Sequence, residues 1–320
     1  MGGAAEPKLS VGVAVITHNA QAILKRCLNP ILLSSLAPRV VVVNSSSTDG
    51  TVELAARMGV ETLIVPRDEF NHGLTRERAR RFLGTDIVVM LTPDAWLDSE
   101  HSLAALIRPL RQGKASVAYA RQLPRREADT IECYNRHFNY PSGSCLRSQA
   151  DWPIYGAETH FCSNACAAWR ASALDEIGGF PPTIVSEETV AAARLLERGH
   201  HVAYVADALV RHSHPAGFWR DFRRQFDTGF TRALYFDLLL KRERDEVRGW
   251  RYMRGLLRTL WYNEQGLLPK AIAHLFASYL GYRIGLIGPK LPLFLARMLS
   301  SQDFFWRSKA MRLTLNQAAG

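Results

Sequence analysis

The sequence predicts a three-layer α/β fold, in which helices cover both faces of a mostly parallel sheet, followed by a helical C-terminal region. Three observations predict it. Short, almost wholly apolar runs, typical of strands buried on both faces, alternate with helical patterns in the first hundred residues. Polar clusters follow the ends of these runs, where ligands bind in such sheets. Beyond residue 217 the composition changes to helix formers, arginines and aromatic residues.

The first part of the chain alternates strands and helices four times. We expect strands at residues 11–17, 40–43, 62–65 and 87–91. Because a helical pattern follows each strand, the strands should run parallel, with their carboxyl ends at one edge of the sheet. The expected helices lie at residues 21–33, 49–58, 74–83 and 102–111.

The middle of the chain is less regular. Residues 117–121 indicate a further strand, but the periodicity is then lost from residue 123 to residue 158. We interpret this segment as a long irregular excursion, and loops of this length are often functional lids. Regular patterns return at residues 161–170 and 173–177, followed by a turn at 178–182, a helix at 187–198 and apolar segments at 202–205 and 208–210.

The change in composition near residue 217 indicates a domain boundary. We expect a disordered N-terminus at residues 1–8, an α/β domain at residues 9–216 and a helical region at residues 217–320. The first ten residues show no signal peptide, and no apolar run reaches the roughly 18 residues of a membrane-spanning helix. These patterns predict a cytoplasmic protein, either soluble or peripheral on a membrane.

Charge and cysteine content narrow the classes of protein further. The 320 residues carry a formal net charge of +10, which favours an anionic partner. The five cysteines are odd in number and irregularly spaced, so a disulfide framework is not expected and a reducing compartment fits better. Cys162 and Cys166 do not indicate a zinc site, because no second ligand pair lies at finger spacing.

Two polar clusters follow the first two expected strands. Thr17-His18-Asn19 comes directly after the first strand. Residues 44–51 form a hydroxyl-rich loop that leads into a helix amino terminus, a natural cradle for phosphate or ribose. A Ser/Thr/Asp helix cap explains this loop about as well, so the loop alone does not establish a binding site.

The third cluster lies in the turn before the basic helix at residues 74–83. Residues 67–73 read Arg-Asp-Glu-Phe-Asn-His-Gly and lead to Thr75-Arg76, which places two guanidinium groups and a glycine around a tight turn. Arginine forks match phosphate oxygens in a bidentate way. We interpret the later arginines of the helix, Arg78, Arg80 and Arg81, as a solvated charged face.

The fourth cluster joins three distant parts of the chain. Asp94 lies in a polar turn after the strand at residues 87–91, where carboxylates commonly hold a divalent cation or a ligand hydroxyl. His212-Ser213-His214, if extended, points both imidazoles to one side and suits a metal. Glu187 and Glu188 open a helix. Helix capping by the acids and structural roles for the histidines remain alternatives.

The order of these clusters resembles that of the family 2 glycosyltransferases of the GT-A fold. The Phe-Asn-His-Gly and Leu-Thr-x-Asp-Ala variants look like the rhamnosyltransferase branch, which builds bacterial O-antigens and other polysaccharides. The resemblance covers roughly residues 9–235 and rests on seven motifs in the right order. They are Thr17-His18-Asn19, Asn44-Ser45-Ser46-Ser47-Thr48-Asp49-Gly50-Thr51, Phe70-Asn71-His72-Gly73, Leu91-Thr92-Pro93-Asp94-Ala95, Gly178-Gly179-Phe180, Ser186-Glu187-Glu188 and His212-Ser213-His214.

The resemblance implies roles for individual residues. It assigns Glu188 as the general base on the acceptor hydroxyl, with Glu187 beside it as the second catalytic candidate. Asp94 would reach a Mg²⁺ or Mn²⁺ ion on the donor diphosphate, with His212 as a further ligand and His214 as the alternative. The nucleoside-diphosphate sugar would be bound by Thr17, Asn19, Asn44, Ser46, Asp49, Arg67, Asn71, His72, Gly73, Arg76 and Thr92.

Three positions depart from the family's pattern. Asn44 replaces the usual Asp after the second strand, and an amide can accept from a base N–H but brings no charge. Thr92 replaces the first Asp of Asp-x-Asp, which leaves fewer carboxylates for the metal. Glu188 in place of Asp lengthens the base by one methylene and shifts its reach by ~1.5 Å.

The resemblance implies direct displacement at the anomeric carbon with inversion, with rhamnose from dTDP-rhamnose as the best match. The acceptor would be a saccharide, free or linked to a polyprenyl diphosphate. One alternative is a non-catalytic member of the same fold that binds a nucleotide sugar or scaffolds an assembly. A nucleotidyltransferase would need a Gly-rich basic loop after the first strand, which is absent. We expect no nucleic-acid partner, because the arginines are dispersed and no nucleic-acid motif is present.

The C-terminal third is basic and aromatic from Phe218 onward. Residues 267–299 are rich in Leu, Ile and Phe but are interrupted by basic residues and prolines. This pattern suits helices that lie in the headgroup layer of an anionic membrane. An ordinary helical subdomain packed on the α/β domain explains the pattern equally well, and the two interpretations are compatible.

Overall fold

A single mixed sheet organises the chain up to residue 211. The computed structural model describes residues 9–240, 246–308, 311, 314 and 315, so the disorder expected for residues 1–8 lies outside the described residues. Within them the strands are β1 (Val11–Thr17), β2 (Arg39–Asn44), β3 (Glu61–Ile64), β4 (Ile87–Leu91), β5 (Trp96–Leu97), β6 (Val117–Leu123), β7 (Cys145–Arg147), β8 (Cys166–Arg170) and β9 (Val202–Arg211).

The strand order is β3-β2-β1-β4-β8-β6-β9-β5, with β7 also paired to β9. Strands β1 to β4, β6 and β9 all run in one direction, so the sheet is mostly parallel, as predicted. Strand β8 runs against its neighbours β4 and β6. Its amino end therefore lies at the edge of the sheet where β4 and β6 have their carboxyl ends.

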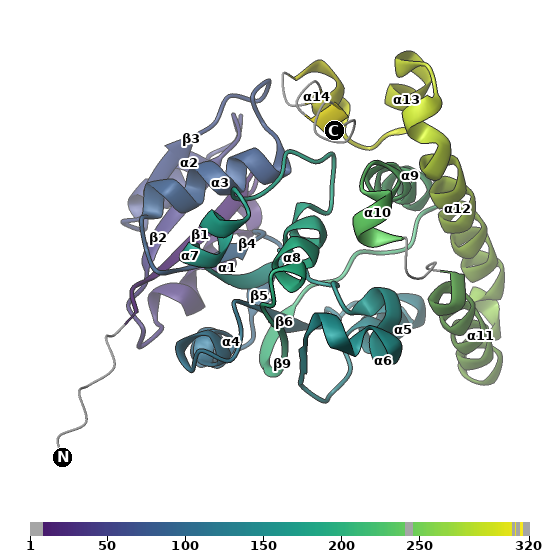
Figure 1. Ribbon diagram of the computed structural model, residues 1–320, viewed down its shortest axis with the longest axis horizontal. Helices are drawn as coiled ribbons and strands as arrows, with labels where there is room; N and C mark the ends of the chain where they lie inside the picture. Colours follow the sequence, from purple (N-terminus) through teal and green to yellow (C-terminus); the bar gives the residue numbers. More distant parts are fainter. Residues whose placement is uncertain (1–8, 241–245, 309–310, 312–313, 316–320) are drawn as a thin grey trace.

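Helices cover both faces of the sheet, which confirms the predicted three layers (Figure 1). Strand β1 is buried throughout because Val13 and Val15 face one core and Ala14 and Ile16 face the other. The first core packs on α1 (Gln21–Leu32), α2 (Thr51–Arg57) and α4 (Ser102–Arg111), and the second on α3 (His72–Leu83), α7 (Ala171–Glu176) and α8 (Glu187–Glu197).

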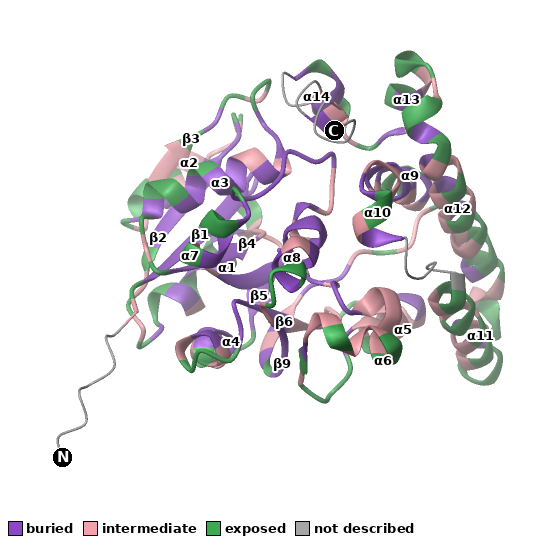
Figure 2. Cartoon of the chain, in the orientation of Figure 1, coloured by how far each residue is buried: buried purple, intermediate pink, exposed green. Residues whose placement is uncertain are grey.

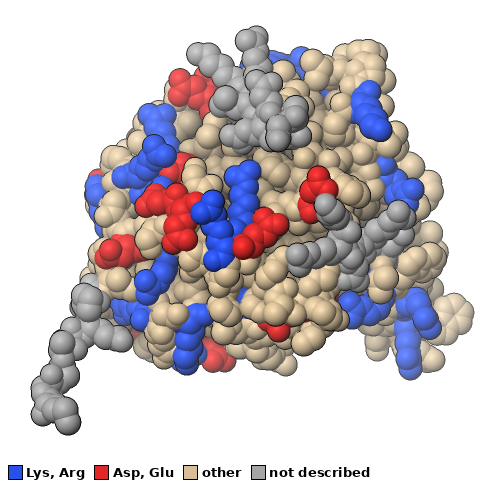
Figure 3. Space-filling view, viewed as in Figure 1, with Lys and Arg blue, Asp and Glu red and all other residues tan. Residues whose placement is uncertain are grey.

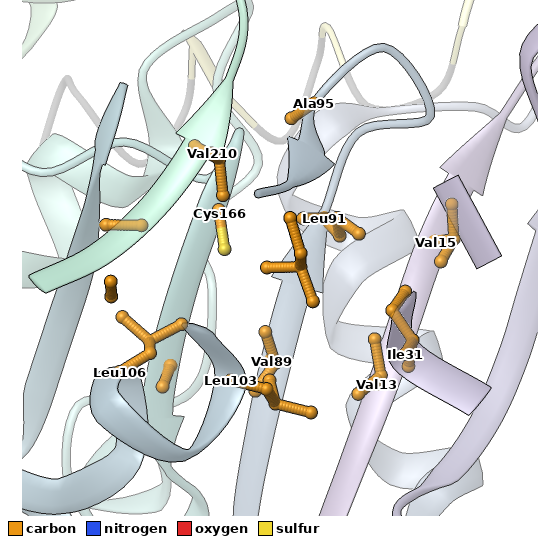
Figure 4. Packing of buried hydrophobic residues seen from close by; sticks show 14 of the residues in the cluster. Val13, Val15, Ile31, Val89, Leu91, Ala95, Leu103, Leu106, Cys166 and Val210 are labelled. Carbon is orange, nitrogen blue, oxygen red and sulfur yellow. The ribbon is translucent and has the colours of Figure 1, made fainter. Parts of the chain in front are cut away.

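The first core is built from branched and small apolar side chains that interdigitate between the sheet and its helices (Figure 4). Leu91 of β4 lies between side chains of β1 and β9, and Cys166 of β8 fills the space beside it. The apolar strands are thus buried on both faces (Figure 2), which explains why they read as continuous hydrophobic runs.

Two predictions about the middle of the chain were wrong. The segments at 202–205 and 208–210 form one strand, β9, whose pairing with β6 shifts register between Val205 and Leu209. The segment at 123–158 is largely ordered into α5 (Thr130–Asn139), β7, η1 (Gln149–Asp151), α6 (Trp152–Tyr155) and η2 (Gly156–Glu158). Helix α5 buries Ile131 against Leu256 and Leu260 of a distant helix, a contact that local periodicity cannot reveal.

The C-terminal region is helical, as predicted. It contains α9 (Phe218–Leu234), α10 (Phe236–Leu239), α11 (Glu246–Asn263), η3 (Gln265–Leu267), α12 (Leu268–Ile287), η4 (Gly288–Lys290), α13 (Leu293–Leu299) and α14 (Asp303–Arg307). Helices α9 and α12 approach closely because Gly281 and Gly285 leave room for the backbone of α9. None of the helices described is long and apolar enough to cross a bilayer.

The last helix returns to the α/β domain. Phe304 of α14 packs edge-on against Phe70, with ring centroids 5.0 Å apart, and lies 6.0 Å from the ring of His72. A separate cluster of apolar side chains joins Phe305 and Trp306 to Phe226 and Phe230 of α9 and to Ile184 before α8. The C-terminal helices are therefore packed on the domain that precedes them.

We predict that Gly73→Ala destabilises the protein. A Cβ at this position would overlap the carbonyl oxygen of Pro181, and rigid backbone cannot yield as a flexible side chain does. We expect a loss of about 1–3 kcal/mol in the free energy of unfolding, measured by urea denaturation. The control is Gly143→Ala, since nothing lies near a Cβ there. Equal stability of the two variants would contradict the close approach.

Candidate active site

The polar clusters meet at one edge of the sheet. Thr17 and Asn44 are paired at the carboxyl ends of β1 and β2. Asp94 follows the end of β4, and His212 follows the end of β9. Because β8 is antiparallel, Leu91 pairs with Cys166, and the backbone N–H of Thr92 donates to the carbonyl of Ala165 at 3.2 Å. The edge thus gathers residues that are more than 100 positions apart.

Asp94, His212 and His214 form a cluster with the geometry of a metal site. Their ligand atoms all lie within 4.8 Å of one another. Asp94 Oδ2 is 3.5 Å from His212 Nε2 and 3.3 Å from His214 Nε2, and the two Nε2 atoms are 3.1 Å apart. The structure therefore brings together the three predicted metal ligands.

The ionisation states of this cluster suit metal binding. Burial lowers the pKa of both imidazoles, that of His214 to about 4, so both are neutral at pH 7. Burial acts to raise the pKa of the Asp94 carboxyl, but its interaction with His212 and the nearby His214 outweigh burial and hold the pKa below its ordinary value. An ionised carboxylate and neutral imidazoles are the forms that bind cations.

A second layer of hydrogen bonds orients His212. Its Nδ1 lies 2.9 Å from Oε1 of Gln122 on β6, and the same oxygen accepts from the Arg136 guanidinium. An oxygen at this position favours a proton on Nδ1, which leaves the Nε2 lone pair directed at Asp94 and His214. Gln122 was not among the predicted site residues. A glutamine at the end of an apolar strand was the available signal.

The two consecutive glutamates have opposite environments. Arg76 pairs with Glu187 at 2.8 Å, and Asn164 donates to the same carboxylate at 2.9 Å. Burial acts to raise the pKa of Glu187, but these partners outweigh it and hold the pKa below its ordinary value. Burial, and then the charge of Glu187, raise the pKa of Glu188 to about 8. Glu188 is thus the better placed of the two to exchange a proton near neutral pH.

The segment Ser163-Asn164-Ala165, ahead of β8, connects all these groups. Ser163 accepts from Gln122, which orients His212, at 2.9 Å. Asn164 holds Glu187, and Ala165 holds the backbone of Thr92, two residues before Asp94. The sequence analysis missed this segment. Its signal was a pair of polar residues at the start of a buried apolar strand.

A cavity of ≈ 210 Å³ opens at the ends of β1 and β4, and Thr92, two residues before Asp94, is part of its wall. Arg67 borders it with its guanidinium carbon 4.5 Å from the ring centroid of Phe304. Of the residues predicted to bind the nucleotide sugar, five line the cavity. They are Thr17, Arg67, His72, Arg76 and Thr92, and Ile16, His18, Phe70 and Phe304 complete the wall.

The Phe-Asn-His-Gly motif is mostly structural. The side chain of Asn71 caps α3 by accepting from the N–H groups of Gly73 and Leu74, and it donates to the carbonyl of Thr183 at 2.8 Å. Gly73 provides space for Pro181. Of the two polar residues in this motif, only His72 lines the cavity. Its Nε2 lies 3.1 Å from Oε1 of Gln302.

The loop after β2 is held by hydrogen bonds within the fold. Asp49 accepts from the backbone N–H groups of Gln21 and Thr51, and Asn19 Oδ1 accepts from the N–H of Thr48. Ser46 accepts from the N–H of Arg67. Asn44 is buried and accepts from the hydroxyl of Ser47. Contacts of these residues with a nucleotide remain predictions.

The mostly parallel three-layer fold and the acid–imidazole cluster at the carboxyl edge of its sheet are those that the resemblance to the GT-A glycosyltransferases implied. Residues 7–229 match the family described as "Glycosyltransferase like family 2". The chain is 32% identical to the O-antigen chain rhamnosyltransferase RfbN of Salmonella typhimurium, over 94% of this chain and 97% of the relative. It is also 32% identical to the O-antigen chain rhamnosyltransferase WbaN of Salmonella anatum, over 84% and 86%.

Solved structures share the fold. A Pyrobaculum calidifontis mannosyltransferase in complex with GDP-Man and Mn²⁺ is 18% identical with a TM-score of 0.54, covering 98% of this chain and 84% of that one. S. aureus TarS 1–349 in complex with UDP-GlcNAc is 14% identical with a TM-score of 0.55, covering 95% and 92%. The chain belongs to the family 2 glycosyltransferases and is a glycosyltransferase, as the motifs predicted.

We predict that Arg76→Met destabilises the fold by about 3–5 kcal/mol, because it leaves the buried Glu187 carboxylate without its counter-ion. The side chains of this pair are only 6% and 4% exposed. Urea denaturation measures the change. The control is Arg78→Met on the same helix, whose exposed partner Glu69 lies 3.6 Å away and whose loss should change stability by less than about 1 kcal/mol. Similar values for both variants would contradict a buried ion pair.

Proposed function

We propose that this glycosyltransferase moves rhamnose from dTDP-rhamnose onto a saccharide acceptor in surface polysaccharide synthesis, with inversion at the anomeric carbon. The relatives that match nearly the full chain are named O-antigen chain rhamnosyltransferases, which supports the sugar and the pathway class. The observation that carries the catalytic part is the Asp94, His212 and His214 cluster, linked through residues 163–165 to the start of α8, which bears Glu188.

A divalent cation fits the acid–imidazole cluster, and the ligand set favours Mn²⁺. One carboxylate and two imidazole nitrogens suit a transition metal better than Mg²⁺, which prefers oxygen ligands. When bound there, such an ion would stabilise negative charge that develops on the departing nucleoside diphosphate. Asp94, His212 and His214 would hold it, with Gln122 fixing the orientation of His212.

The chain's own residues would supply the remaining chemistry. Arg67 adds positive charge at the wall of the cavity, where the diphosphate would lie. Glu188 takes the proton from the acceptor hydroxyl as that oxygen attacks, a contribution of typically ~10²–10⁴-fold. Glu187 keeps Glu188 basic through its negative charge, while its own carboxylate stays paired with Arg76.

We place the reaction in the cytoplasm, at the inner face of the plasma membrane. The five cysteines are all free, which is consistent with a reducing compartment. The acceptor would be a saccharide linked to a polyprenyl diphosphate.

Donor binding should be selective and should depend on the metal. A thermal-shift screen should give the largest stabilisation with dTDP-rhamnose and Mn²⁺, about 2.7 kcal/mol at 100 times the dissociation constant. UDP-glucose and GDP-mannose should stabilise the protein less than dTDP-rhamnose does. In Asp94→Asn, adding Mn²⁺ should no longer increase the stabilisation by the donor. A larger shift with the other donors would overturn the donor assignment, and no shift with any of the donors would overturn nucleotide-sugar binding.

Transfer should require Glu188. Rhamnose transfer to membranes of a Salmonella strain that lacks RfbN should fall at least ~10²-fold in Glu188→Gln. Donor binding in the thermal-shift assay should persist in this variant, because Glu188 faces the acceptor. If the variant transfers rhamnose at the rate of the unchanged protein, Glu188 is not the general base.

The rate should also rise with pH. Because the pKa of Glu188 is raised to about 8, the carboxylate form is scarce at pH 6 and dominant at pH 9. We expect kcat/KM to increase by about tenfold per pH unit at low pH and to level off above the pKa. If the pH profile of the residual kcat/KM of Glu188→Gln levels off at the same pH as that of the unchanged protein, the titrating group is not Glu188.

A further inference from the structure

The outer faces of α11, α12 and α13 carry most of the exposed apolar side chains of the protein. Among the described residues, eleven of the twenty exposed large hydrophobic side chains lie between residues 247 and 298. These helices form one end of the molecule, on the right in Figure 1, and Figure 2 shows their outward sides exposed. An accumulation of this kind on a folded surface marks an interaction site.

On α12 the exposed side chains form one stripe. Residues 272, 276, 279, 283 and 287 recur at helical spacing on a single face. Phe276 and Tyr279 are 58% and 60% exposed, and Arg283 lies over the ring of Tyr279 at 5.9 Å. The opposite face of α12 is occupied, because Ala277, Gly281 and Gly285 are buried and the glycines lie against α9.

On α11 arginines and aromatic side chains share the exposed face. Trp250, Trp261 and Tyr262 are all more than half exposed, and Arg254 and Arg258 are exposed between them. The inward side of this helix packs through Leu256 and Leu260 on Ile131 of α5. The helix is therefore fixed in place with its arginines and tryptophans directed outward.

The charge of this surface is strongly positive. Residues 246–300 contain eight Lys and Arg residues but only two glutamates and no aspartate. Three of the eight, Arg248, Lys270 and Arg297, pair closely with acids of neighbouring segments. No ion pair joins Arg254 or Arg258 to an acid in the described part of the chain, and Arg251 is 3.8 Å from Glu158 with 65% of its side chain exposed. In the view of Figure 3, basic side chains lie along this edge, and no acidic side chain of a described residue is visible there.

We propose that the outer faces of α11, α12 and α13 dock on an anionic lipid surface. Tryptophan and tyrosine favour the headgroup region, and arginines between them would contact lipid phosphates. The apolar stripe of α12 and the exposed Leu293, Phe294 and Met298 of α13 would enter the boundary of the acyl chains. A second copy of the chain is disfavoured as the occupant, because two such basic surfaces would repel each other.

The proposal does not depend on the donor or on catalysis. Helices α11, α12 and α13 project no side chain into the acid–imidazole cluster or the cavity beside it. Membrane binding and sugar transfer can therefore be measured separately. Asp94→Asn should bind vesicles as well as the unchanged protein does, whether or not it transfers sugar.

Co-sedimentation with vesicles tests the proposal. The full-length protein should bind vesicles of phosphatidylcholine and phosphatidylglycerol at low salt, and should be released at high salt because the charges are screened. Replacing Arg251, Arg254 and Arg258 together by glutamine should lower the partition coefficient by about a hundredfold, at about fivefold per basic residue. Trp261→Ser should remove part of the binding that resists salt.

Two controls keep the test specific. Replacing Lys25, Arg57 and Lys114 by glutamine removes the same charge from exposed positions on or beside α1, α2 and α4, and should leave binding within about twofold. Equal loss in this control, or equal binding to pure phosphatidylcholine, would overturn the proposal. A dimer in analytical ultracentrifugation that the Phe276→Ser substitution dissociates would also overturn the proposal, since the surface would then bind a second copy of the chain.

Discussion

The site depends on the position of β8, which runs antiparallel between the two strands β4 and β6. Because β8 begins where its neighbours β4 and β6 end, the three residues before it can contact groups from three separate parts of the chain. Ser163 reaches the glutamine behind His212, Asn164 reaches Glu187, and Ala165 holds the turn that carries Asp94. Hydrogen bonds to one rigid strand end thus set the relative positions of the metal ligands and the acids.

The two adjacent glutamates show how one helix terminus can hold two carboxylates with different tasks. Arg76 forms a buried ion pair with Glu187, whereas Glu188 makes no ion pair with any described residue. The charge on Glu187 then adds to burial in raising the pKa of its neighbour. Environments that push two pKa values apart are the usual means of dividing structural and proton-transfer roles. The buried Arg76–Glu187 ion pair is therefore useful here as an electrostatic device.

Local pattern was sufficient for the parallel half of the sheet, because β1, β2 and β4 are buried almost throughout and a helix follows each of β1, β2 and β3. The Asp94, His212 and His214 cluster was also predictable from polar residues after strand ends. Three features could not be predicted from local sequence pattern. The order of α5 depends on Leu256 and Leu260, more than a hundred residues away. The second hydrogen bond of Asn71, from its amide to the carbonyl of Thr183, joins the cap of α3 to a segment more than a hundred residues away. Gln122 and Asn164 act through partners that only the fold brings near.

The route of the last sixty residues links two distant ends of the molecule. The chain leaves α13, which we propose to face lipid, and after three residues enters α14, whose Phe304 forms part of the cavity at the ends of β1 and β4. Gln302, between these helices, contacts His72 in the same wall. The C-terminal region therefore supplies part of the wall of the cavity that we propose for the donor. Exchanging this region for the tail of another glycosyltransferase would change that wall, and with it the proposed choice of donor.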